Sequence, residues 1–210
     1  MKKAIGIDLG TTNSVVAIKK KDVEILRNKE NLELTRSCIG VKNDEILVGK
    51  TAYDLFKRDP ENTIFSVKRL MGGAITDPMI QKMKNDNDYY RFSITSLEGG
   101  TEDALAIILG GKQYTPEELS AIIIKKLKKD AEENMDDELS NIVVTVPAYF
   151  TEKQKNATRL AAHYTGVKVS KILAEPTAAA IAYGVDDLEP GEATTVLIYD
   201  FGGVRLTCQY

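Results

Sequence analysis

The sequence predicts a mixed α/β fold that contains an inserted segment, and three observations support this prediction. Residues 4–26 hold three short apolar runs in succession, which is typical of an antiparallel meander. From residue 114 onward, helical patterns alternate with β-branched runs, as expected where helices connect parallel strands. Between these regions, residues 38–113 show an irregular pattern, which we interpret as an insertion.

The first part of the chain reads as strands. Residues 4–8 and 14–19 form two strands joined by Leu9-Gly10-Thr11-Thr12-Asn13, and residues 23–26 form a third. Inside the insertion we expect a helix near residues 51–57 and short strands near residues 90–94 and 104–109.

The second part begins with a capping box, because Thr115 and Glu118 flank a proline at the first helical position. This helix should run to about residue 134. A second capping box at Thr151 and Gln154 opens a helix that ends at Gly166. The remaining elements are expected as strands at residues 141–146, 167–173 and 196–200 and as an alanine-rich helix at residues 175–184.

Composition narrows the function classes. The chain has 210 residues, 43% of them hydrophobic, and a net charge of -3, so it is long enough for a core and lacks the basic footprint of a nucleic-acid binder. No segment is long enough to span a membrane, and the apolar run before Asp8 is too short for a signal peptide. Cys38 and Cys208 are far apart and predict neither a disulfide nor a zinc site. We therefore expect a cytoplasmic protein whose single histidine, His163, is an ordinary helical residue.

Two loops carry candidate chemistry. Asp8 ends a strand and precedes Gly10, Thr11 and Thr12, which offers a carboxylate for a hydrated metal ion and a turn that faces phosphate. Taken alone, this pattern also fits an ordinary strand followed by a polar turn. Asp200-Phe201-Gly202-Gly203 repeats it, so a second copy of the domain begins near the end of the chain and the two loops predict a nucleotide clamp.

Four motifs in order resemble the 70-kDa heat-shock chaperone family: residues 5–14, Val67-Lys68-Arg69-Leu70-Met71-Gly72, Val144 to Phe150, and Ala174 to Ala180. The likeness covers residues 3–203. It implies an actin-like ATPase with two ribonuclease-H-like lobes around ATP and magnesium. This chain would hold the first lobe, a mixed five-stranded sheet with helices (residues 1–37 and 114–188), an inserted α+β subdomain (residues 38–113) and the start of the second lobe (residues 189–203), with the rest of that lobe absent.

The resemblance also implies site roles. Asp8 and Asp200 would face magnesium through water, and Gly10, Thr11, Thr12, Asn13, Gly202 and Gly203 would contact the nucleotide, with K⁺ as a further candidate ion. Lys68 would stabilise charge on the γ-phosphate, while Glu175 and Asp200 orient water and metal. By charge alone, Lys68 with Arg69 also fits a solvated basic pair, and Glu175 an ordinary acidic residue at a helix N-terminus.

Two positions depart from the family pattern. Pro147 would relay nucleotide state to a substrate-binding domain, usually together with an arginine where this chain has Lys155. Lys171 similarly stands where the main bacterial chaperone has an arginine that helps to dock a J-domain partner. A lysine keeps the charge but loses the forked donor of an arginine, so both substitutions put the coupling and the docking in doubt.

For the parent protein, the resemblance implies ATP and ADP, unfolded client peptides, a J-domain co-chaperone and a nucleotide exchange factor as partners. The family sequence breaks off after Gly203, and one restored nucleotide would let it continue, so we expect residues 204–210 to be out of frame. The truncated chain should then be inactive alone. An actin-like filament subunit, a sugar kinase of the same fold and a non-functional gene remnant are the alternatives.

Overall fold

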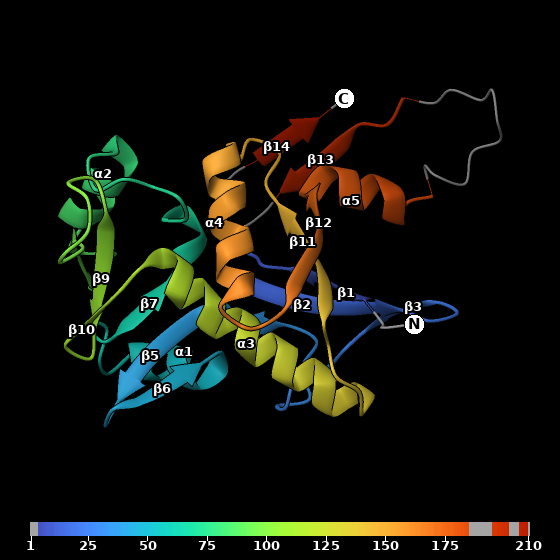
Figure 1. Cartoon of the computed structure of the whole chain (residues 1–210), viewed down its shortest axis with the longest axis horizontal. Coiled ribbons are helices and arrows are strands. Elements are labelled where there is room, and N and C mark those ends of the chain that lie inside the picture. The colour runs from blue at the N-terminus through green and yellow to red at the C-terminus, as the bar shows by residue number, and fades with distance from the viewer. Residues whose placement is uncertain (1–3, 185–194, 202–205, 210) are drawn as a thin grey trace.

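The computed structural model describes residues 4–184, 195–201 and 206–209. A main sheet and two three-stranded sheets share one hydrophobic core. Figure 1 shows the small sheets on one side of the main sheet. The long helix α3 (Pro116–Met135) contacts strands of all three sheets. The predicted mixed α/β fold with an insertion is therefore confirmed.

The main sheet has the strand order β12, β11, β1, β2, β3, and a short strand, β4, pairs with the start of β2. The first three strands of the chain are antiparallel, whereas β11 lies parallel to both β1 and β12. Both predicted arrangements are thus confirmed. The strands are Ala4–Asp8 (β1), Asn13–Lys19 (β2), Val23–Ile25 (β3), Thr35–Arg36 (β4), Asn141–Val146 (β11) and Lys168–Ala174 (β12).

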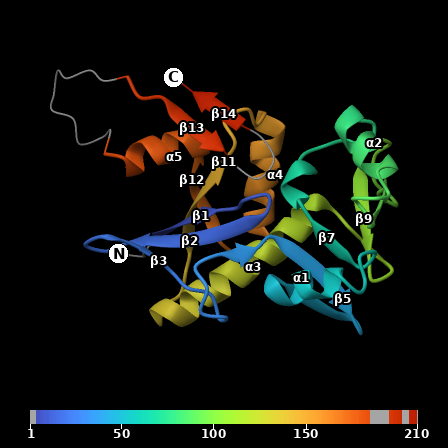
Figure 2. The ribbon, with the colours of Figure 1, turned by 180° about the vertical axis from the view of Figure 1, so that it is seen from behind.

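The two faces of this sheet differ because successive side chains of a strand point in opposite directions. Ile5 and Ile7 enter the core, on the face that α3 and α4 (Glu152–His163) cover. Gly6 and Asp8 lie on the other face, which lines an open cleft. Helix α5 (Glu175–Ala182) lines the same cleft. Figure 2 shows this helix from behind, beside β11 and β12.

Both predicted capping boxes are confirmed. In α3 the Thr115 hydroxyl accepts from the Glu118 amide, and the Glu118 carboxylate accepts from the Thr115 amide. Thr151 and Gln154 make the same reciprocal pair at α4. Such caps satisfy amide groups that the first helical turn leaves without partners. The two helices start where the sequence predicts.

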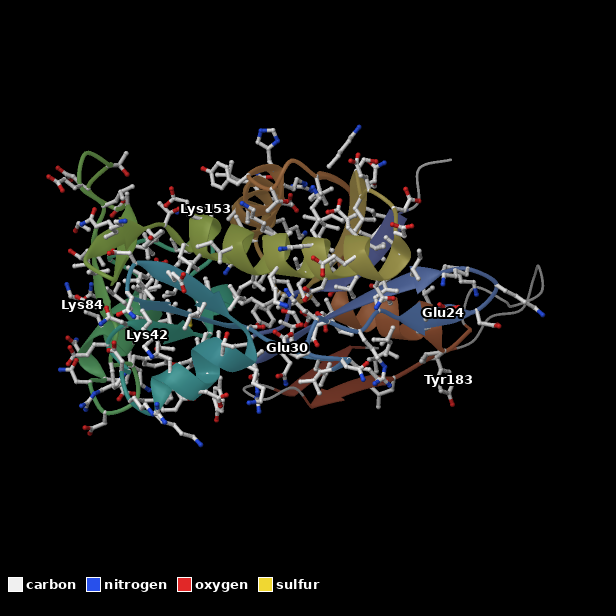
Figure 3. All side chains as sticks on the ribbon, turned by 90° about the horizontal axis from the view of Figure 1, so that it is seen from below. Glu24, Glu30, Lys42, Lys84, Lys153 and Tyr183 are labelled. Atoms are coloured by element: carbon white, nitrogen blue, oxygen red, sulfur yellow. The ribbon has the colours of Figure 1, made fainter. Side chains whose placement is uncertain are left out.

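The insertion contains more regular structure than expected. Its first sheet pairs β5 with β6 and β7, and its second pairs β9 with β8 and β10. Figure 3 shows Lys42 and Lys84 at the end of the molecule that the insertion forms, with Glu24 and Tyr183 at the opposite end. The elements are Cys38–Lys42 (β5), Glu45–Val48 (β6), Lys50–Phe56 (α1), Thr63–Phe65 (β7), Val67–Arg69 (the 3₁₀ turn η1), Pro78–Asn85 (α2), Ser93–Ser96 (β8), Leu105–Leu109 (β9) and Lys112–Tyr114 (β10).

The helix predicted at residues 51–57 and the strand predicted at residues 104–109 are confirmed to within about one residue at each end. The strand predicted at residues 90–94 is misplaced, because pairing begins only at Ser93. Tyr90 instead packs with Phe65 and Phe92 in an aromatic cluster. The apolar pattern at residues 90–94 therefore reflects burial of the aromatic rings of Tyr90 and Phe92 and not only strand pairing.

Strand β13 (Ile198–Phe201) pairs antiparallel with β14 (Leu206–Gln209). A strand near Asp200 that opened a second sheet would have no backbone partner within this chain. That expectation from the sequence is wrong, because the following segment supplies one. The proposal that residues 204–210 are out of frame stays a prediction.

Candidate functional site

A cleft of about 1340 Å³ lies over the exposed face of the main sheet. Several of the predicted site residues line it: Asp8, Gly10, Thr11, Thr12, Asn13, Lys68, Pro147 and Glu175. They come from strand ends, a turn, the insertion and the start of a helix. The fold thus brings together candidates that are far apart in the sequence.

Asp8 is held by a neighbour that the sequence analysis missed. Parallel pairing of β1 with β11 places Thr145 beside Asp8, and the Thr145 hydroxyl donates a hydrogen bond of 2.7 Å to Oδ1 of Asp8. Among the described residues, no group donates a hydrogen bond to Oδ2, the other carboxylate oxygen of Asp8. The parallel register is the signal for this pair, since it places Thr145 beside Asp8 on the same face of the sheet.

The turn after Asp8 is tight at Gly10. A Cβ at this position would lie 2.0 Å from the carbonyl oxygen of Asn13, a distance that no side chain tolerates. Within the turn Thr11 is half-buried and Thr12 exposed. Glycine is therefore required by the backbone itself, which makes the turn more than an ordinary polar loop.

Lys68 is the middle residue of the turn η1. Ser66, which precedes this turn, has a left-handed backbone (φ 59°, ψ 29°) that is uncommon for a residue other than glycine. Only 8% of the Lys68 side chain is exposed, and its Nζ lies 2.5 Å from Oε1 of Glu175, the first residue of α5. This ion pair joins positions 107 residues apart. Lys68 is therefore not part of a solvated basic pair.

Other contacts fix the loop that carries Lys68. Arg69 donates to the hydroxyl of Tyr90 at 2.5 Å, and burial raises the pKa of that hydroxyl although the guanidinium opposes the shift. A Cβ on Gly72 would lie 3.0 Å from the backbone of Gln154 in α4. The loop is thus held between Tyr90 of the insertion and the start of α4.

The two predicted relay residues, Pro147 and Lys155, lie at the end of β11 and in the first turn of α4. Pro147 is buried directly after β11 and lines the cleft. The Lys155 ammonium donates to Oε1 of Glu152 at 2.8 Å, and this hydrogen bond with its charge lowers the pKa of Glu152. Lys171 is exposed on β12, an edge strand of the main sheet. Their roles in a relay and in docking stay predictions.

The structure describes only part of the second predicted loop, residues 200–203. Asp200 lies in β13, whose backbone pairing is described, whereas Gly202 and Gly203 lie outside the described residues. Among the described residues, no group of three His, Cys, Asp or Glu side chains could hold a metal ion directly.

The single histidine and the buried cysteine lie in ordinary structural positions. His163 is an exposed residue of α4. Burial raises the pKa of the Cys38 thiol to about 12.

None of the helices in the described part of the chain has the length and apolar character needed to cross a membrane.

The fold and the cleft define the first lobe of an actin-like ATPase. A profile of the family described as Hsp70 protein matches residues 4–209. The chain is also 44% identical over 204 residues to the chaperone protein DnaK of Psychrobacter cryohalolentis, an alignment that covers 97% of this chain. The chain therefore belongs to the Hsp70 family, and it spans about 30% of the length of that DnaK.

Proposed function

We propose that this chain forms the phosphate-facing wall of the ATP site in an ATP-hydrolysing chaperone. The observation that carries the proposal is the Lys68–Glu175 ion pair, which faces the same cleft as Asp8 and the turn at residues 10–13. Phosphoryl transfer needs precise positioning and neutralisation of negative charge. A buried cation, two carboxylates and a glycine turn around one cleft supply these needs.

Magnesium fits this set of residues. Mg²⁺ retains most of its waters and takes one or two carboxylates together with substrate phosphates, so it does not need a cluster of three protein ligands. Asp8 offers one carboxylate, oriented by the Thr145 hydroxyl, and Asp200 is the second candidate. When bound, the ion would neutralise charge on the phosphate oxygens. K⁺ remains a further candidate.

Each protein group has a distinct part in the proposed reaction. The turn at residues 10–13 binds the phosphates, and Gly202 and Gly203, which lie outside the described residues, are proposed as further contacts to the nucleotide. Lys68 neutralises charge that develops on the γ-phosphate and the attacking water. Glu175 holds the lysine in place and orients the water, because its carboxylate has a second oxygen besides the one bonded to Lys68.

The activity of the whole protein rests on the family. The relative's name, chaperone protein DnaK, supports a chaperone over the alternative of an actin-like filament subunit. ATP-driven handling of unfolded client peptides is the activity that we propose for the whole protein. We extend the proposal to a J-domain co-chaperone docking near Lys171 and to a nucleotide exchange factor. Pro147 and Lys155 are the proposed relay toward the substrate-binding part, in a cytoplasmic protein.

Alone, the 210-residue chain should bind magnesium ATP weakly and turn over almost none, because closure from all sides completes such sites and excludes water. The test is a titration of the ¹⁵N-labelled chain with magnesium ATP, with phosphate release measured in parallel. Shifts of the amide signals at residues 10–13 in the millimolar range are the expected result.

Asp8→Asn should remove the magnesium dependence of these shifts, while Asp44→Asn, in an exposed turn of the insertion, should leave it unchanged. An absence of shifts at the turn would overturn the proposed site. Micromolar affinity together with multiple turnover would instead show that the chain is competent alone.

A further inference from the structure

We propose that Ser37 is a positioning residue of the nucleotide site, which holds the turn at residues 10–13 in its phosphate-binding shape. The inference rests on the proposed function and names a residue that none of the recognised motifs contains. Ser37 is only 3% exposed and does not line the cleft. It lies behind the turn, between β4 and β5.

Two bonds of Ser37 act directly on the turn. Its hydroxyl donates to the carbonyl oxygen of Gly10 at 2.7 Å, and its amide donates to the carbonyl oxygen of Thr12 at 2.9 Å. These carbonyls belong to alternate residues of the four-residue connection between β1 and β2, residues 9–12. Fixing both of them fixes the rotation of the peptide groups between them, and with it the directions of the amides that would face phosphate.

A second buried serine completes the arrangement. Oγ of Ser14 lies 2.9 Å from Oγ of Ser37, and Ser14 is only 1% exposed. A serine hydroxyl has one proton, and that of Ser37 is directed to Gly10, so Ser14 must be the donor of this bond. Ser37 is thereby locked in one rotamer, as a positioning residue requires.

The position of Ser37 also links the turn to Lys68. The next residue, Cys38, starts β5 and pairs with Phe65 of β7, three residues before Lys68. One small sheet therefore carries both the clamp on the turn and the approach to the lysine. Such a link keeps the two phosphate-facing groups at a fixed separation.

The test compares variants of the 210-residue chain by titration with magnesium ATP and, separately, with magnesium tripolyphosphate. Ser37→Ala should raise the dissociation constant for both probes by roughly five- to tenfold. It should also speed amide exchange at residues 10–13 without nucleotide. Ser37→Thr keeps the hydroxyl and should restore affinity to within about twofold. Thr63→Val is the matched control, because it removes a fully buried hydroxyl that donates to the carbonyl of Asp59 away from the cleft.

Equal affinities of wild type and Ser37→Ala would overturn the inference, as would an equal loss in Thr63→Val. A loss for ATP without a loss for tripolyphosphate would overturn it too, because the hydroxyl would then act away from the phosphates. If Ser37→Ala does not fold, Ser14→Ala decides: a rise of roughly twofold supports the inference and unchanged affinity contradicts it. Absence of any wild-type shift with either probe overturns the proposed function itself, a result distinct from a variant that binds normally.

Discussion

The turn at residues 10–13 and the loop that carries Lys68 face the same cleft but are held by different forces. Hydrogen bonds from the buried Ser37 and the close approach of Gly10 to Asn13 fix the turn. The Lys68 loop depends on an ion pair to Glu175 and on packing against α4. The turn should therefore respond mainly to changes of backbone shape, and the loop to changes of charge.

The largest expected effect is a break of the turn by Gly10→Ala. The added Cβ would lie 2.0 Å from a backbone oxygen, so the turn must rearrange. We expect a loss of about 3 kcal/mol in the free energy of unfolding and loss of the ATP-induced amide shifts.

Gly6→Ala is the control for this variant, because its Cβ would meet only the Ala17 carbonyl, at 3.9 Å. It should change the free energy of unfolding by less than about 1 kcal/mol, measured by urea denaturation. Equal losses in both variants would show that the shape of the turn is not what Gly10 protects.

The second effect tests the charge dependence of the loop. Glu175→Gln leaves the Lys68 ammonium, 8% exposed, without its counter-charge, and should cost about 2 kcal/mol of unfolding free energy. Lys68→Met should cost about 1 kcal/mol or less, because Glu175 is 26% exposed and can regain water. Urea denaturation at neutral pH measures the loss of unfolding free energy in each variant, and the expected result is a larger loss for Glu175→Gln than for Lys68→Met. A larger loss for Lys68→Met would contradict the burial argument.

The sequence predicted the main sheet well because each of its elements is marked locally. Capping boxes begin α3 and α4, and continuous β-branched runs mark the parallel strands. The insertion was predicted less well. Strands such as β7 and β10 are only three residues long, and they form because distant partners pair with them.

The site residues also fall into two groups, those that a motif in the sequence predicts and those that only contacts between distant segments reveal. Asp8 and Gly10 were found from a local motif, and the family resemblance added Lys68 and Glu175, whose contact spans 107 residues. Thr145 and Ser37 were missed, because a serine or threonine that bonds to a distant backbone or carboxylate leaves no pattern in its own neighbourhood. Only the register of β1 with β11, and of β2 with β4, brings them to the site.

The third effect tests the hydrogen bond from Thr145 to Asp8, the carboxylate that precedes the turn. Thr145→Val removes the donor to Asp8 while keeping the shape of the side chain, so the carboxylate gains rotational freedom. Magnesium ATP should bind roughly fivefold more weakly, and Thr145→Ser should restore most of the affinity. Calorimetry at several magnesium concentrations measures this. Normal affinity in Thr145→Val would show that Asp8 is oriented without its neighbour.

The smallest effect concerns the first turn of α4, against which the Lys68 loop packs. Lys155 lowers the pKa of Glu152 below its ordinary value of 4.5, mainly through their hydrogen bond. A carboxyl whose pKa is lower in the folded state stabilises the fold above its unfolded pKa, and this contribution is lost as the pH falls through the folded pKa. The contribution should therefore be present at neutral pH and fade only below about pH 4.5.

Lys155→Ala should raise the pKa of Glu152, whereas Lys155→Arg should keep it low, because a guanidinium donates to the carboxylate at least as well as an ammonium does. A titration followed by NMR of the glutamate side chains measures this directly. The result bears on the proposed relay, since an ammonium with a single short bond to Glu152 has less reach toward Pro147 than a forked guanidinium that can serve both. An unchanged pKa of Glu152 in Lys155→Ala would show that the pair does not persist in solution and that Lys155 is free to take part in the relay as it stands.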